Sequence, residues 1–402
     1  MLRNVLGVLI LFGSAGISQA EPNPVTLTSL TNYVFRQAPE RLAEQSIIDT
    51  ADAYAERAKT WFAEPASLNL FHYNDAIGSS NGLQEWETSI SAPIWLSGEQ
   101  RRQQNWAQEL SNQLPYYQQK HRLQAAGQVR QHIWTVVHAA ARVRQTEIRR
   151  DNAAGLFETV KAQAEKGYLA TTDKLIAEQH RMAAQNDHLQ AQAELTQAIN
   201  QYYYLTAQRQ LPDNVVESLP SSLKITVDHP LLAELSQQIT ILHSEMASTS
   251  LTAKQNPNLS LGIKRERGSG SEPFNNSLGL GISLPIGQTN YAKASVAEVG
   301  RKLANIEVAR QSLKRRLESS LLHQRDTLSA LRDKQQRLQA QFSLSETYQH
   351  KQQKSFDLGQ IDLRTLLLVE AEHNATRNQL QMTQIEINQT IAQINQTLGI
   401  MP

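Results

Sequence analysis

Cysteine is absent from the 402-residue chain, which excludes disulfide scaffolds, thiolate nucleophiles, cysteine-ligated zinc, iron–sulfur clusters and lipidation on cysteine. An excess of either charge is also absent, because 39 Lys and Arg face 38 Asp and Glu, for a formal net charge of +1. Nucleic-acid binders normally carry a basic excess, so we expect no nucleic-acid partner. Outside the N-terminal region, no apolar run approaches the roughly 18 residues that a membrane-spanning helix requires.

Catalytic motifs are missing as well. The 11 histidines are scattered, and neither an HExxH nor a GxSxG sequence occurs. Gly279-Leu280-Gly281 lacks the third glycine of a dinucleotide-binding loop and lies in a predicted strand. We therefore expect a protein that is not an enzyme, with no catalytic residue, no cofactor and no resident metal.

The first residues, 1–20, have the pattern of a secretory signal peptide. A basic start at Arg3 precedes the apolar stretch Val5–Ile17, and small residues end at Ala20, after which cleavage is predicted. An uncleaved anchor is the alternative. A predicted export signal, together with polar helices and the absence of cysteine, favours a protein of the bacterial envelope.

Five long segments predict helices, because their apolar residues recur at alternating steps of three and four. They cover residues 98–166, 172–208, 230–254, 290–356 and 362–398. The first alone would be about 100 Å long at a rise of about 1.5 Å per residue. Their remaining faces are polar and rich in glutamine, so each helix would pack along a narrow seam. Taken alone, these segments also fit a soluble helical bundle or a coiled-coil scaffold.

Four shorter segments alternate with period two, which predicts strands at about 66–73, 83–95, 258–266 and 276–287. One face of each is apolar and the other is small or polar, as in a transmembrane barrel, although hairpins of an ordinary sandwich alternate in the same way. The polar-face residues that would line a barrel interior are Glu87, Ser91, Lys264, Gly281 and Ser283. The aromatic residues near strand ends that would lie at a lipid–water interface are Phe71, Tyr73, Trp86 and Trp95.

The sequence is internally duplicated at a shift of 192 residues. Matched pairs at that shift include Pro65 and Pro257, Pro93 and Pro285, Gly167 and Gly359, and Glu178 and Glu370. We expect a first repeat over residues 21–211, a linker over 212–229 and a second repeat over 230–402. Each repeat would have the order helix, strand, strand, long helix, glycine turn and long helix.

Four strands cannot form a closed barrel alone, and open strand edges cannot face lipid, because their backbone groups would stay unpaired. Barrels need about eight or more strands, so several chains must share one barrel, and three copies would supply roughly twelve strands. The expected fold is therefore mainly α with a small transmembrane β part, in which long coiled-coil-like helices continue a shared trimeric barrel.

This layout resembles the TolC family of outer-membrane efflux proteins over essentially the whole mature chain. The segments that carry the resemblance are Leu27-Thr28-Ser29-Leu30 through Gln37-Ala38-Pro39, Ile90-Ser91-Ala92-Pro93-Ile94, Ile282-Ser283-Leu284-Pro285-Ile286, Gly167-Tyr168-Leu169 and Phe356-Asp357-Leu358-Gly359-Gln360-Ile361. The resemblance implies a homotrimer with its barrel in the outer membrane and its helical tunnel in the periplasm. A periplasmic adaptor (membrane fusion) protein and an inner-membrane pump of the RND type would dock on the tunnel.

The resemblance also places the adaptor-docking tip and the gate at the two glycine turns. The residues it implicates there are Gly167, Thr171, Asp173, Gly359, Asp362 and Arg364. Asp173 matches a family position for an aspartate that helps to hold the closed state, whereas Thr365 and Leu368 stand where family members carry constricting aspartates. Phe356 and Ile361 replace the Tyr and Arg of well-studied members. The usual latch is therefore not expected, because Phe has no hydroxyl group and Ile carries no charge.

The function that follows is a passive exit duct of a tripartite efflux system for small solutes, energised by its partner pump. In length and in lacking a cysteine for lipidation, the chain looks most like the metal-exporting, CzcC-like branch, which suggests heavy-metal cations as cargo. A multidrug duct and a type I protein-secretion duct of the same family are alternatives. The alternative from another class is a soluble periplasmic coiled-coil scaffold or adaptor.

Overall fold

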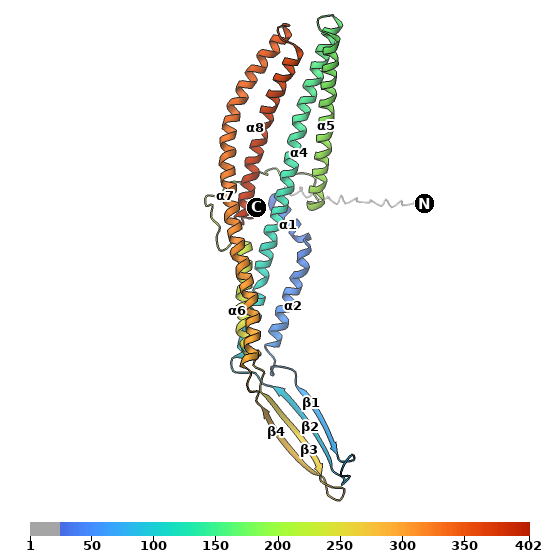
Figure 1. The fold of residues 1–402 in the computed structure, drawn as a ribbon, viewed down its shortest axis with the longest axis vertical. Coiled ribbons are helices and arrows are strands. Elements are labelled where there is room, and N and C mark those ends of the chain that lie inside the picture. Colours follow the sequence, from blue (N-terminus) through green and yellow to red (C-terminus); the bar gives the residue numbers. More distant parts are fainter. Residues whose placement is uncertain (1–24) are drawn as a thin grey trace, which may run out of the picture.

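A computed structural model describes residues 25–402, so the predicted signal peptide lies outside the described residues. The described chain is elongated, with long helices at one end and a sheet at the other (Figure 1). The helical end finishes in two helix–helix turns, residues 166–170 and 358–362, which we call the turn end.

Nine helical segments build the body of the described chain. Their bounds are α1 Leu27–Gln37, the 3₁₀ turn η1 Pro39–Arg41, α2 Leu42–Arg57, α3 Glu99–Ser111, α4 Gln113–Glu165, α5 Thr171–Thr206, α6 Pro230–Thr252, α7 Thr289–Asp357 and α8 Leu363–Thr397. The predicted helix over 98–166 is present but is interrupted at Asn112 between α3 and α4. None of the helices in the described range is both long and apolar enough to cross a membrane.

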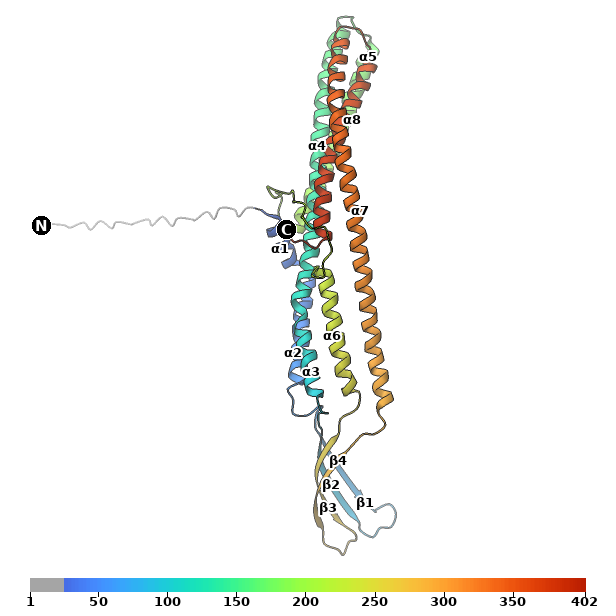
Figure 2. The same cartoon turned by 90° about the vertical axis from the view of Figure 1, so that its left-hand side faces the viewer.

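The helices lie side by side in a thin layer. Towards the turn end the lateral order is α7, α8, α4, α5 (Figure 1), and towards the sheet it is α7, α6, α3, α2. In the view turned by 90°, the upper helices overlap in projection, whereas towards the sheet α3, α6 and α7 are seen side by side (Figure 2). The long helix α7 therefore forms one lateral edge of the chain, while α5 and α2 form the other.

The sheet has four antiparallel strands in the order β1-β2-β3-β4, with bounds β1 Ser67–Asn74, β2 Gln84–Pro93, β3 Asn258–Arg267 and β4 Asn275–Ser283. Pairing of β2 with β3 joins the two predicted hairpins into one sheet. The strands β2 and β4 end at Pro93 and Ser283, before the predicted ends near 95 and 287. Beyond β4, Pro285 has no N–H to donate to a ladder. The outer edges of β1 and β4 are unpaired within the described chain.

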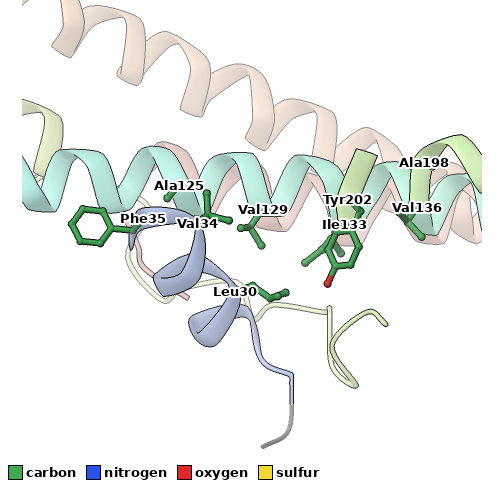
Figure 3. Close-up of a cluster of buried hydrophobic side chains, with 9 residues drawn as sticks. All are labelled: Leu30, Val34, Phe35, Ala125, Val129, Ile133, Val136, Ala198 and Tyr202. Atoms are coloured by element: carbon green, nitrogen blue, oxygen red, sulfur yellow. The ribbon is translucent and has the colours of Figure 1, made fainter. Parts of the chain in front are cut away.

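The largest apolar cluster of the described residues fixes α1 against α4 and the C-terminal part of α5 (Figure 3). Val129 and Ile133 of α4 and Tyr202 of α5 are almost fully buried, and the Tyr202 hydroxyl donates to the Gln210 carbonyl at 3.0 Å. The cluster residues are Leu30, Val34, Phe35, Ala125, Val129, Ile133, Val136, Ala198 and Tyr202. Their spacing along α4 is the three-and-four pattern that predicted this helix.

A buried ion pair connects the 207–229 segment to the helices. The guanidinium of Arg130 on α4 pairs with the carboxylate of Glu217 at 2.7 Å, and the two side chains are only 5% and 10% exposed. The same guanidinium donates to Gln396 and to the carbonyl of Ile400. Burial of the pair is tolerated because the guanidinium is surrounded by acceptors.

Candidate functional site

Glycines reverse the chain at both turns of the turn end. Gly167 and Gly359 have φ angles of +79° and +72°, which residues with a side chain rarely adopt. After the first glycine, the Tyr168 N–H donates to the carbonyl of Gln163 at 2.9 Å, and the equivalent bond at the second turn measures 2.8 Å. These are the hydrogen bonds of a Schellman motif, so each glycine ends its helix and starts the reversal.

Aspartates start the two helices that leave the turns. The Asp173 carboxylate accepts from the Ala170 N–H at 3.3 Å, and the Asp362 carboxylate accepts from the Thr365 N–H at 2.8 Å. Asp173 lies in the first turn of α5 and accepts from the N–H of the residue before the helix, whereas Asp362 precedes α8 and accepts from an N–H in its first turn. Both carboxylates therefore satisfy backbone N–H groups that have no partner within the helix. The hydrogen bonds from Thr365 lower the pKa of Asp362 below its usual value. The capping carboxylate of α8 therefore stands at Asp362, three residues before Thr365.

Apolar packing joins the two hairpins near the turns. Phe356 is only 4% exposed, and Ile361 packs against the same cluster, which combines α4, α5, α7 and α8. The buried members are Leu156, Phe157, Val160, Ala177, Phe356, Leu363 and Leu366. Phe356 and Ile361, which stand where the resembled family carries Tyr and Arg, therefore lie in an apolar contact, where a hydroxyl group or a charge would be costly to bury.

The remaining turn-end candidates lie on the surface. Thr171 and Arg364 are exposed, and so are the apolar side chains of Tyr168 and Leu358, at 78% and 64%. Leu368, at a position where relatives of the resembled family carry an aspartate, is 63% exposed. The structure brings these residues to one end of the molecule, and their docking and gating roles remain predictions.

The five polar residues predicted for the barrel interior share one face of the sheet. Glu87 lies opposite Lys264, and Ser91 lies in register with Gly281 through Ser260, while Ser283 is two residues further along β4. The Lys264 ammonium pairs with Glu85 at 3.1 Å and with Glu266 at 2.7 Å. We call this side of the sheet the polar face.

Two aromatic residues lie on the polar face, contrary to the lipid–water interface predicted for them. Phe71 is in register with Glu87, and Tyr73 with Glu85, so their side chains share a face with these carboxylates. The two rings lie 6.3 Å apart and nearly parallel. The prediction was wrong because it used their position near a strand end and ignored the alternation along β1. Trp86, by contrast, lies on the opposite face and stacks on His72.

The opposite side of the sheet is a continuous apolar surface, which we call the apolar face. Its large side chains are exposed by about half to three quarters; they are Leu68, Leu70, Ile90, Leu261, Ile263, Leu278, Leu280 and Ile282. Cross-strand register places Leu70 in line with Ile263 and Leu278, so the residues form rows across all four strands. Exposed apolar area of this extent marks a surface that another molecule covers.

A second unpartnered apolar surface lies along α5, and the sequence reading missed it. Leu175, Met182, Leu189 and Tyr203 are between 44% and 63% exposed and stand at multiples of seven residues. A spacing of seven along a helix is the signature of a coiled-coil contact. The spacing was visible in the sequence, but only the structure shows that α4 leaves this stripe uncovered.

No cluster of three or more His, Asp or Glu side chains able to hold a metal ion occurs within residues 25–402.

Comparison with known proteins identifies the fold. No protein-family model matches the chain, and no curated protein matches its sequence. Among solved structures, that of CusC, studied for transmembrane channel formation, has a TM-score of 0.70 at 15% identity over 93% of this chain and 92% of that chain. The outer membrane protein VceC from Vibrio cholerae has a TM-score of 0.71 at 12% identity, covering 93% and 96%. The outer membrane channel CmeC of Campylobacter jejuni has a TM-score of 0.68 at 12% identity, covering 99% and 94%. The chain has the fold of these outer-membrane channels, and the TolC-like fold predicted from the sequence is confirmed.

Proposed function

We propose that this protein is the outer-membrane duct of a tripartite efflux system and a member of the TolC family. It performs no reaction, and solutes pass through a tunnel made by three copies of the chain. Its barrel lies in the outer membrane and its helices extend into the periplasm, where a periplasmic adaptor and an inner-membrane pump of the RND type dock on the turn end.

One observation carries this proposal: the sheet exposes an entire apolar face and leaves both of its edges unpaired. Water is a poor solvent for such a face, and unpaired edges cannot face lipid. Lipid against the apolar face and neighbouring copies at β1 and β4 satisfy both requirements together. With four strands per chain, three copies make a barrel of about twelve strands.

The helices support the same arrangement. The exposed stripe on α5 lies at one lateral edge, and exposed apolar residues of α7, among them Leu322, Leu344 and Tyr348, lie on the other edge helix. When copies stand side by side, α5 of one chain meets α7 of the next. The barrel interior then carries the polar face, and the solute path is lined by carboxylates, hydroxyls and glycines.

Targeted charge substitutions test the membrane assignment. Leu280→Lys places a charge on the apolar face, where lysine in a bilayer costs about 2–4 kcal/mol at the midplane. Ser277→Lys, three residues earlier on the same strand, places it on the polar face. We expect the first variant to be lost from the outer-membrane fraction and the second to be retained as a trimer. Equal recovery of both variants, or an unsubstituted protein found wholly in the soluble periplasm, would refute the proposal.

Cargo is tested by a susceptibility panel on a deletion strain and its complemented control. The panel covers divalent metals, copper and silver, dyes, detergents and antibiotics. Hypersensitivity to metals alone supports the metal-exporting branch, whereas broad hypersensitivity supports a multidrug duct. Loss of a secreted protein without hypersensitivity points to type I secretion.

A further inference from the structure

Large apolar side chains are exposed on both lateral edges where the sheet meets the helices. On one edge, just before β1, Trp61 is 91% exposed and Phe62 is 40% exposed. On the other edge, just after β4, Ile286 is 93% exposed and Tyr291 is 78% exposed. Both sets lie at the junction of sheet and helices, because β1 and β4 are the outer strands and these residues adjoin their ends (Figure 1).

The segment that carries Trp61 is held firmly in place. The Ala63 N–H donates to the carbonyl of Pro93 at 2.9 Å, and the Trp95 indole N–H donates to the carbonyl of Thr60 at 3.0 Å. The Thr60 hydroxyl closes the segment by donating to the carbonyl of Phe62 at 2.7 Å. Trp61 is therefore held outward by an ordered backbone, which is unexpected for a large indole unless another surface covers it.

A contact within the chain suggests which surface covers Trp61. The end of β2 meets the start of β3, and there the Ile94 N–H donates to the carbonyl of Pro257 at 2.8 Å. In the internal repeat of 192 residues, Ile286 corresponds to Ile94 and Pro65 corresponds to Pro257. Ile286 and Pro65 lie on opposite edges of the same chain, so they can meet in this way only between two copies.

We propose that Ile286 of one subunit packs against residues 61–65 of the next subunit, with Trp61 covering the contact. The inference rests on the proposed trimer and adds to it the residues that close each subunit boundary between barrel and tunnel. A second copy is favoured over lipid as the occupant, because the contact continues the β4-to-β1 edge pairing and repeats a hydrogen bond already present within the chain.

Cysteine pairs test this contact without background, because the natural chain contains no cysteine. Residues directly opposite in antiparallel strands have Cα atoms about 4.5–5.5 Å apart, within the range of a disulfide. The test variant combines Pro65→Cys with Ile286→Cys in the full-length protein. The matched control combines Ser97→Cys, an exposed residue of the junction within the subunit, with Ile286→Cys. Native mass spectrometry in detergent reports the trimer, and non-reducing gels report covalent links.

We expect the test pair to become a covalent trimer that a reductant reverses, and the control pair to stay largely unlinked. A native trimer without the disulfide would overturn this inference and leave the duct intact, and it would point to lipid as the cover of Trp61. A natural protein that forms no trimer would overturn the duct itself.

If the double cysteine variant alone fails to assemble, the trimers of two alanine variants, Trp61→Ala and Ile77→Ala, are compared instead. Ile77 is fully exposed on the loop between β1 and β2. Only Trp61→Ala should lower the temperature at which the trimer dissociates, and equal behaviour would overturn the contact.

Discussion

Replacing Phe356 with alanine should loosen the turn end while leaving the rest of the tunnel folded. The ring is 4% exposed in an apolar cluster that joins α4, α5, α7 and α8. Apolar packing is thus what holds the two hairpins together here. The substitution removes most of that contact from the α7 side.

The magnitude follows from the burial. Truncating a buried phenylalanine to alanine costs about 3–5 kcal/mol, and a site close to a surface that can collapse lies at the lower end of this range. About 3 kcal/mol corresponds to roughly a hundredfold change in the local opening equilibrium, since about 1.4 kcal/mol is tenfold. Local opening of this kind is measured by amide hydrogen exchange.

The reporters are the amides of Gly359 and Gln360, whose N–H groups donate to the carbonyls of Phe356 and Ser355, each at 2.8 Å. Their exchange should accelerate roughly a hundredfold in Phe356→Ala. Leu358→Ala is the matched control, because Leu358 lies two residues away and is 64% exposed. It should change exchange by only a few fold. Equal protection in both variants would refute the conclusion that the buried ring holds the turn end.

Three further predictions follow from single contacts. Arg130→Met should lower the free energy of unfolding by about 3–5 kcal/mol in urea, because it leaves the buried carboxylate of Glu217 unpaired. The control Arg149→Met removes an ion pair with Asp187 whose partners are half-exposed, and it should cost less than about 1 kcal/mol. Gly262→Ala should weaken the β2–β3 seam and the yield of trimer, because its Cβ would lie 2.7 Å from the Ser89 Cβ; Gly279→Ala has no atom nearer than 3.9 Å and should be silent. The start of α8 should fray in acid, because the pKa of Asp362 in the folded protein is lowered. The hydrogen bond from Thr365 to the Asp362 carboxylate stabilises the helix fully above the ordinary carboxyl pKa. This stabilisation is lost as the pH falls through the lowered pKa of Asp362. Exchange at the Thr365 amide measures this loss, and Asp362→Asn, which keeps an acceptor oxygen but cannot titrate, should remove the pH dependence.

Much of the fold could be predicted because helices and strands each leave a short hydrophobic period in the sequence. Steps of three and four identified each long helix to within a few residues, and alternation identified the four strands and the polar face that holds Glu87 and Lys264. The glycines Gly167 and Gly359 marked both turns. Signals of this kind depend on residues within one or two turns of each other, so neighbours in the sequence are sufficient.

Other features depended on contacts that no local pattern specifies. Pairing of β2 with β3, residues about 170 apart in sequence, decides which residues stand opposite one another. It also completes the apolar rows that run from β1 to β4, in which Leu68 and Ile90 lie in line with Leu261 and Leu280. Likewise, Phe356 was recognised as a substitution in a latch, but only packing between two distant hairpins shows that the ring is buried.

The amino-acid sequence by itself determined the elements, their amphipathic faces and the turns, because backbone propensity and periodicity act over a few residues. The tertiary structure decided which of those faces are satisfied within one chain and which are not. The apolar face of the sheet, the α5 stripe and the two edges around Trp61 and Ile286 remain uncovered in a folded copy. A free surface is a property of the whole packed chain, since it depends on every element that could have covered it and does not.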